Sequence, residues 1–242
     1  MSALVDRAAG PRGGHPGAVA TARAGAACGV AFTVLMATAG FVVPPAPESD
    51  VAVGKVRDYL VSHAGGLAVS TALMGVAAMA VIGFFALVHG RLRAAGRDGE
   101  VAPAAFLVAG GVAVTATLVG LVVQAALVHQ IAPTADESTL AAFYALWDRV
   151  YHTVPPMGMA VALVTASVSG LRSRVLPRWT CLVALPTSAL LLVDIIEDLT
   201  TTGTNLGPLG LVGFGLVNVW IVGVSVAAWR QPAAVTGAGA EP

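Results

Sequence analysis

The sequence predicts an all-α membrane protein, a bundle of six transmembrane helices with both termini in the cytoplasm. Three observations support this fold class. Of the 242 residues, 57% are hydrophobic and only 11% are charged, whereas about 25% of residues in a soluble domain are charged. The apolar residues gather into six long stretches, and the basic residues fall on alternate loops between them.

The six apolar stretches are bounded by proline and glycine and are each near the ~20 residues that a helix needs to cross the bilayer. Helices are required there, because a bare backbone N–H or C=O in lipid costs several kcal/mol. The predicted spans are 24–43, 66–89, 104–128, 153–171, 179–199 and 208–229. They form one transmembrane domain over 24–230. The flanking segments 1–23 and 231–242 lack an apolar period and are predicted to be disordered cytoplasmic tails.

The distribution of lysine and arginine sets the predicted orientation, since cytoplasmic loops carry an excess of both. The chain has 13 such residues. With the N-terminus inside, the outer loops hold only Lys55, Arg57 and Arg149. The inner segments hold all the others, which are Arg7, Arg12, Arg23, Arg91, Arg93, Arg97, Arg172, Arg174, Arg178 and Arg230.

The first span has an alternative interpretation as a signal peptide. Ala37-Thr38-Ala39 follows an apolar run and resembles a signal-peptidase site. The run of about 20 residues is longer than the apolar region of a usual signal peptide, so we expect the span to be retained. Cleavage would leave five spans and an external N-terminus.

Two outer loops are predicted to contain helices. Thr134 and Glu137 have the spacing of a capping box, so a helix should begin there and continue into the fourth span. Asp50 is predicted to cap a shorter helix that ends near His63. The helix predicted to begin at Thr134 has an amphipathic stripe, formed by Leu140, Phe143, Tyr144, Trp147, Val150 and Tyr151.

Asp194 is the main candidate for a functional residue. It lies about 22 Å along the fifth span from Trp179, at a helical rise of 1.5 Å per residue, and therefore inside the outer leaflet. A charge in the membrane costs on the order of 3 kcal/mol on insertion scales, so the carboxylate should face protein and have a partner. By depth, the nearest donors are Arg149 and His152, with His129 of the third span as an alternative.

Other carboxylate and imidazole groups fall at a similar depth. The predicted candidate cluster is Asp148, His152, Asp194, Glu197 and His129, with Asn218 and Gln124 as further intramembrane polar residues. Such groups could bind a divalent metal or relay protons. The alternative is structural: Asp194 joins two spans, while Glu197 and Asp198 are solvated at the helix end. We prefer the structural interpretation, assign no catalytic residue and do not favour a divalent metal.

Four local patterns resemble those of a broad group of bacterial six-span membrane proteins of unknown function. The patterns are Val56–Leu60 before the second span, the basic stop Gly90–Arg93 after it, the segment from Leu140 to Asp148, and Leu176–Trp179. The resemblance covers about residues 30–230. It implies a multi-pass protein of the bacterial cytoplasmic membrane, and it offers no catalytic residue to transfer.

The leading functional prediction is a non-enzymatic membrane protein whose biochemical role the sequence does not specify. One alternative is a small proton- or ion-coupled transporter, which would need a polar cavity lined by Gln124 or Asn218. The other is a metal-dependent enzyme at the outer leaflet, which would need three or more of the candidate ligands around one point. The lipid bilayer is the predicted partner, and a net charge of zero gives no indication of nucleic-acid binding.

Overall fold

The computed structural model describes residues 16–47, 51–96, 101–200 and 207–230, and within these ranges it contains helices and no strand, which confirms the all-α prediction. Six of the helices are long and apolar enough to cross a membrane, so the chain is a multi-pass membrane protein. These helices are α1 (Pro16–Val42), α3 (Ala64–Ala95), α4 (Ala102–Ala126), α6 (Glu137–Ser173), α7 (Arg178–Thr200) and α8 (Gly207–Arg230).

The start of α1 corrects the predicted boundary of the N-terminal tail. The helix begins at Pro16, so residues 16–23, expected to be disordered, are helical. Proline suits the first position of a helix, and the alanine-rich segment that follows has high helix propensity. The remainder of that tail and residues 231–242 lie outside the described residues.

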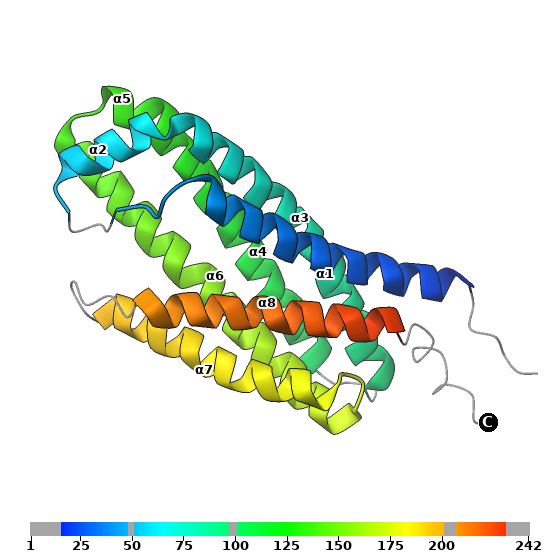
Figure 1. The fold of residues 1–242 in the computed structure, drawn as a ribbon. Helices are drawn as coiled ribbons and strands as arrows, with labels where there is room; N and C mark the ends of the chain where they lie inside the picture. Colours follow the sequence, from blue (N-terminus) through cyan, green and yellow to red (C-terminus); the bar gives the residue numbers. More distant parts are fainter. Residues whose placement is uncertain (1–15, 48–50, 97–100, 201–206, 231–242) are drawn as a thin grey trace, which may run out of the picture.

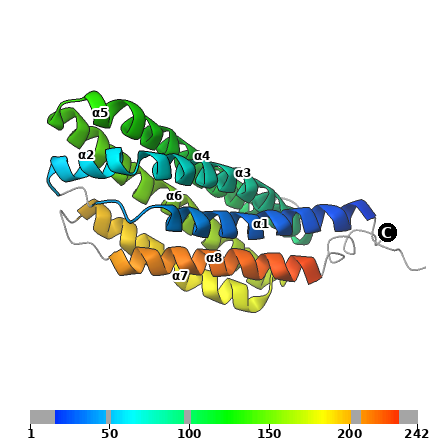
Figure 2. The ribbon, with the colours of Figure 1, turned by 45° about the horizontal axis from the view of Figure 1, so that its top comes forward.

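The long helices form a ring in which each packs against two neighbours (Figures 1 and 2). The order around the ring is α1, α3, α4, α6, α7 and α8, and α8 returns to α1. Aromatic side chains fill the interior: Phe84 meets Trp220 edge to face at 5.5 Å, and Phe85 meets Phe106 in the same way at 5.5 Å. Outward-facing residues such as Val122 are apolar and exposed, as expected for a surface in contact with lipid.

Glycines allow the closest helix contacts within the ring. A Cβ added at Gly25 would lie 2.6 Å from the Cβ of Leu87 on α3, and one added at Gly158 would lie 2.7 Å from the carbonyl oxygen of Ala109 on α4. Small residues let helix backbones approach in this way, and van der Waals packing then holds the helices together. Gly25 thus serves the packing of α1 against α3 within the bundle.

The two ends of the bundle differ in charge. The end that we call the α2 end contains α2 (Val53–Ser62), the π-helical turn η1 (Leu127–Ile131) and α5 (Ala132–Thr134). The acidic residues of the described ranges all lie in this half: Asp58, Asp136, Glu137, Asp148, Asp194, Glu197 and Asp198. The opposite end, the arginine end, carries Arg23, Arg91, Arg93, Arg172, Arg174, Arg178 and Arg230.

The capping box predicted at Thr134 is wrong. Thr134 is the last residue of α5, and its hydroxyl donates to the carbonyl of Gln130 in the preceding turn. Asp136 has an extended backbone and caps α6 instead, since its carboxylate accepts from the Thr139 N–H at 2.9 Å. Helix α2 begins at Val53, and its predicted cap Asp50 lies outside the described residues.

We expect Asp136→Ala to loosen the first turn of α6. Hydrogen bonds from Ser138 and Thr139 lower the pKa of the Asp136 carboxyl well below its usual range. A lowered pKa means that the stabilisation is present above the ordinary aspartate pKa of about 3.9 and is lost as the pH falls further. Amide exchange at Thr139 should be faster in the variant at pH 7, and the difference should shrink in acid. Equal exchange in both proteins at pH 7 would contradict this assignment.

Candidate functional site

The amphipathic stripe predicted on α6 is confirmed in part. Leu140, Tyr144 and Trp147 are buried at the α2 end, and Tyr151 is half-buried below them. Phe143, however, is 44% exposed. The buried face follows steps of four, three and four residues, and Phe143 falls beside it because each residue turns the helix by about 100°. The stripe therefore places three aromatic rings on one face.

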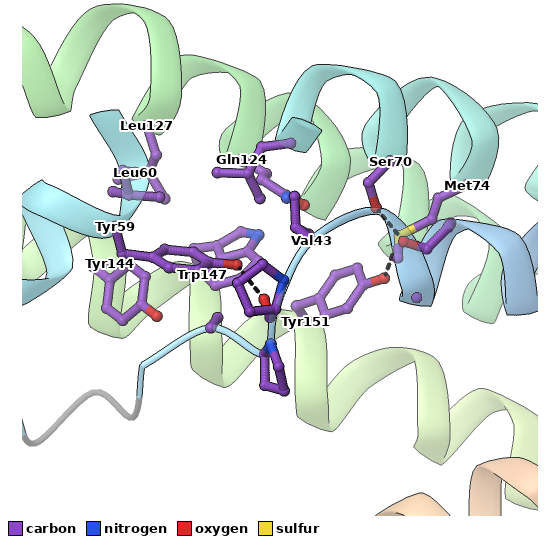
Figure 3. Close-up of a pocket in the computed structure, with 16 residues that line it drawn as sticks. Val43, Tyr59, Leu60, Ser70, Met74, Gln124, Leu127, Tyr144, Trp147 and Tyr151 are labelled. Carbon is purple, nitrogen blue, oxygen red and sulfur yellow. Dashed lines mark hydrogen bonds between the residues drawn. The ribbon is translucent and has the colours of Figure 1, made fainter. Parts of the chain in front are cut away.

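These rings form one wall of a cavity of about 190 Å³, which we call the strap pocket (Figure 3). The other walls come from the C-terminal end of α1, from α2, α3 and α4, and from residues 43–47, which we call the strap. The lining residues used below are Gly40, Tyr59, Gln124, Tyr144, Trp147 and Tyr151. Three separate stretches of the chain, 39–74, 124–127 and 144–151, thus meet at one site.

Tyrosine hydroxyls hold the strap in place. Pro44 and Pro47 have no N–H to donate, so the strap offers carbonyl acceptors at these positions. The Tyr59 hydroxyl donates to the carbonyl of Pro44 at 2.8 Å, and the Tyr144 hydroxyl donates to the carbonyl of Pro47. Burial raises the pKa of the Tyr59 phenol, which keeps it a neutral donor at ordinary pH. The strap is therefore bound to α2 and α6 at once.

The other polar groups of the aromatic wall also have partners. The Trp147 Nε1–H donates to the carbonyl of Gly120 at 3.1 Å, and the Tyr151 hydroxyl donates to the sulfur of Met74 at 3.3 Å. The rings of Trp147 and Tyr151 are stacked, with centroids 5.7 Å apart and planes at 21°. The donors of this wall point into the protein.

Gln124 is the exception among the polar groups of the pocket. Its side chain is 7% exposed and lines the pocket, and no hydrogen bond joins its amide to another described residue. In Figure 3 the amide projects from α4 toward the space beside Val43. Buried amides are nearly always hydrogen-bonded, because leaving one unpaired costs free energy. The amide is thus available to a molecule in the pocket.

Asn218, the other intramembrane amide predicted from the sequence, lies elsewhere. Its Nδ2 donates to the carbonyl of Phe214 one turn earlier on α8, at 2.9 Å. It is not among the residues that line the strap pocket. The structure therefore brings Gln124, and not Asn218, to the cavity.

The predicted acidic and histidine cluster is only partly assembled between α6 and α7. His152 Nδ1 lies 2.9 Å from the Asp148 carboxylate, one turn away on α6. Thr153 donates to the Asp198 carboxylate at 2.8 Å, and Arg149 donates to the carbonyl of Asp198. Asp198 was expected to be solvated at the helix end, and instead it joins the two helices. Nothing in the amino-acid pattern marks Thr153 as a partner of Asp198, since one threonine in a span is common.

The hydrogen bond predicted for Asp194 is not formed. No hydrogen bond or ion pair joins its carboxylate to Arg149, His152 or His129, all of which the structure describes. The carboxylate faces α8, where a Cβ added at Gly210 would lie 2.9 Å from both oxygens. Gly210 is in the first turn of α8, and the N-terminus of a helix carries partial positive charge. The charge of Asp194 is thus placed against a helix end.

His129 is separated from the other candidates. It is exposed on η1 and lines a second groove of about 220 Å³ between α3 and α4, together with Thr71. Glu197 is half-buried on α7. Within the described ranges, no group of three or more His, Cys, Asp or Glu side chains is arranged to hold a metal ion. The arrangement that a metal-dependent enzyme would require is therefore not formed by the five candidates.

Comparison with known proteins assigns no family to this chain. No family model matches the sequence, and searches of curated proteins and of solved structures find no significant match. The resemblance to bacterial six-span proteins stays a prediction, and the function has to be inferred from the geometry of the site.

We expect Asp194→Asn to have a small effect on stability. The variant loses the attraction between a charge and the N-terminus of α8, which is typically worth 0.3–1 kcal/mol. The free energy of unfolding, measured by denaturant titration in detergent, should fall by no more than about 1 kcal/mol. A loss of several kcal/mol would mean that Asp194 has a stronger partner than this helix end.

Proposed function

We propose that the protein is a non-enzymatic, multi-pass protein of a bacterial cytoplasmic membrane that binds a small molecule in the strap pocket. One observation carries this proposal: Gln124 is only 7% exposed, and its side-chain amide lines a cavity without a hydrogen bond to a described residue. A ligand that accepts from or donates to this amide would remove the cost of leaving it unpaired. The aromatic wall would supply the apolar contact area.

The binding side is proposed to be the outer side of the membrane. The arginine end carries the larger share of basic residues, which places it in the cytoplasm by the positive-inside rule. The α2 end, with the strap pocket, would then face outward, and both termini would be inside. Ligands would reach the pocket without crossing the bilayer.

Reporter fusions test this orientation. Fusions after residues 95 and 175 should report a cytoplasmic location, because these loops follow or contain the arginines at 91–93 and 172–174. Fusions after residues 50 and 135 should report an external location. A reporter after residue 175 that is found outside would reverse the proposed sidedness.

Ligand screening with a blocked pocket tests the binding function. Purified protein in detergent is screened by thermal stability against a panel of small amines, alcohols and aromatic compounds. Gly40 is exposed at the edge of the pocket, and a Cβ added there has no atom within 4 Å, so Gly40→Phe should place a ring at the pocket entrance without a clash. Gly75→Phe is the matched control, because Gly75 is equally open and lies outside the pocket lining.

We expect at least one compound to stabilise the wild type and the Gly75→Phe variant, and to lose that effect in Gly40→Phe. A panel without any stabilising compound, or compounds that act equally on both variants, would contradict the proposal.

Proton-coupled transport is a second candidate function. The observation that favours it is the His152–Asp148 pair at 2.9 Å, one residue along α6 from Tyr151 of the pocket. A carrier would change the internal pH of proteoliposomes when a pocket ligand is added outside, and His152→Gln would abolish the change. Ligand binding without any pH change would contradict proton-coupled transport and would agree with ligand binding as the function.

A further inference from the structure

We propose that the ligand of the strap pocket is a small organic cation with a methylated ammonium group. This inference rests on the proposed binding function and adds the chemical class of the ligand. Four aromatic side chains line the pocket: Tyr59, Tyr144, Trp147 and Tyr151. Aromatic faces carry negative partial charge and attract cations, and quaternary ammonium groups are commonly bound by such rings.

The hydrogen bonds of the four rings favour this ligand class. Each ring has one polar donor, and each donor is bound to the strap, to α3 or to α4. What the rings offer to a ligand is their carbon surface. Methyl groups on a charged nitrogen match that surface, because they need no hydrogen bonds and spread the positive charge over an apolar exterior.

Carboxylates are absent from the part of the pocket lining that the structure describes. A primary ammonium has three donors and would find only neutral acceptors in this lining, with no carboxylate to pair its charge. A quaternary ammonium has none, so the same lining costs it less. Gln124 remains as the single side-chain amide, and it would bind a hydroxyl or carbonyl elsewhere on the ligand.

The charge of the α2 end also favours a cation. All the acidic residues described lie in this half, against three basic residues, Lys55, Arg57 and Arg149. Arg57 is already bound to backbone carbonyls at the end of α5. An excess of one sign of charge around a site raises the local concentration of the opposite ion.

The size of the pocket limits the ligand to a few heavy atoms. Its volume is about 190 Å³, and an apolar protein cavity of about 150 Å³ is known to bind benzene. Tetramethylammonium and choline are of this order of size. Choline also carries one hydroxyl, which Gln124 could bind.

A comparison of choline with its neutral isostere tests the inference on the wild-type protein. In 3,3-dimethyl-1-butanol a carbon replaces the charged nitrogen, and the shape and hydroxyl are unchanged. Titration calorimetry at constant ionic strength should show choline binding about tenfold more tightly, which is within the range expected for cation–π contacts. Gly40→Phe should abolish the binding of choline.

The Tyr151 ring provides a matched pair of variants. Tyr151→Leu removes an aromatic face and should weaken choline binding about fivefold, with little effect on the alcohol. Tyr151→Phe keeps the ring and should bind choline like the wild type.

The two proposals fail in different ways. Equal affinity for choline and the alcohol, or binding of other panel compounds but not of choline, would overturn the cation inference and leave the binding function intact. If neither these two compounds nor any panel compound binds, both proposals are wrong.

Discussion

Gly158→Leu is expected to prevent the protein from being recovered in its folded form. A Cβ at this position would lie 2.7 Å from the carbonyl oxygen of Ala109 and 2.9 Å from the backbone nitrogen of Ala113. Both atoms belong to the backbone of α4 and cannot rotate away. Overpacking of a tight contact typically costs 1–3 kcal/mol and occasionally more, and a leucine at a backbone contact should reach the upper end, about 3 kcal/mol or above.

Gly111→Leu on α4 is the control for this experiment. A Cβ added at Gly111 meets no atom within 4 Å, so the leucine should be accepted and the helix should not lose stability. Size-exclusion profiles and thermal unfolding of the two variants measure the difference. Similar behaviour of both would show that α4 and α6 do not approach as closely as the structure indicates.

The six spans could be predicted from the sequence because an apolar run of bilayer length has few alternatives to a helix. The aromatic stripe on α6 could also be predicted, since Leu140, Tyr144 and Trp147 follow the helical period. The helix boundaries could be predicted less closely, as the start of α1 at Pro16 shows. Residues beyond the bilayer can continue a helix without any change in hydropathy.

The candidate site was less predictable, because its contacts join segments that the sequence does not relate. Depth along a helix placed Asp194 near Arg149 and His152, and depth alone does not give the direction in which a side chain points. The carboxylate instead faces the first turn of α8 at Gly210. Glycine has no side chain, so the sequence does not mark this position as a partner for a carboxylate. A sequence analysis that looks for oppositely charged side chains therefore does not find a partner that consists of backbone dipoles.

Gln124 shows a second limit of sequence analysis. Its depth marked it as an intramembrane polar residue, but the cavity in front of it is created by the strap and by α2. The strap follows α1, about 80 residues earlier in the chain than Gln124. A pocket of this kind depends on how distant segments meet, and a periodic pattern within one segment does not contain that information.

Arg57 has a structural role at the α2 end, where basic residues are few. Its guanidinium donates to the carbonyls of Ala132 and Ala135, which the end of α5 leaves without helical partners. One planar group with several donors can reach both carbonyls, and an ammonium group is a poor substitute. Arg57 thus joins α2 to the end of the α4–η1–α5 segment.

We expect Arg57→Met to lower the free energy of unfolding by about 2 kcal/mol. Hydrogen bonds from a charged group are worth about 1.5–3 kcal/mol each, and partial exposure of this guanidinium reduces the total. Amide exchange at Ala135 should accelerate, and ligand binding in the strap pocket should weaken because α2 carries Tyr59. Lys55→Met is the control, since Lys55 is exposed on the same helix and should show neither effect. If Arg57→Met and Lys55→Met have the same stability and exchange rates, the end of α5 does not depend on Arg57.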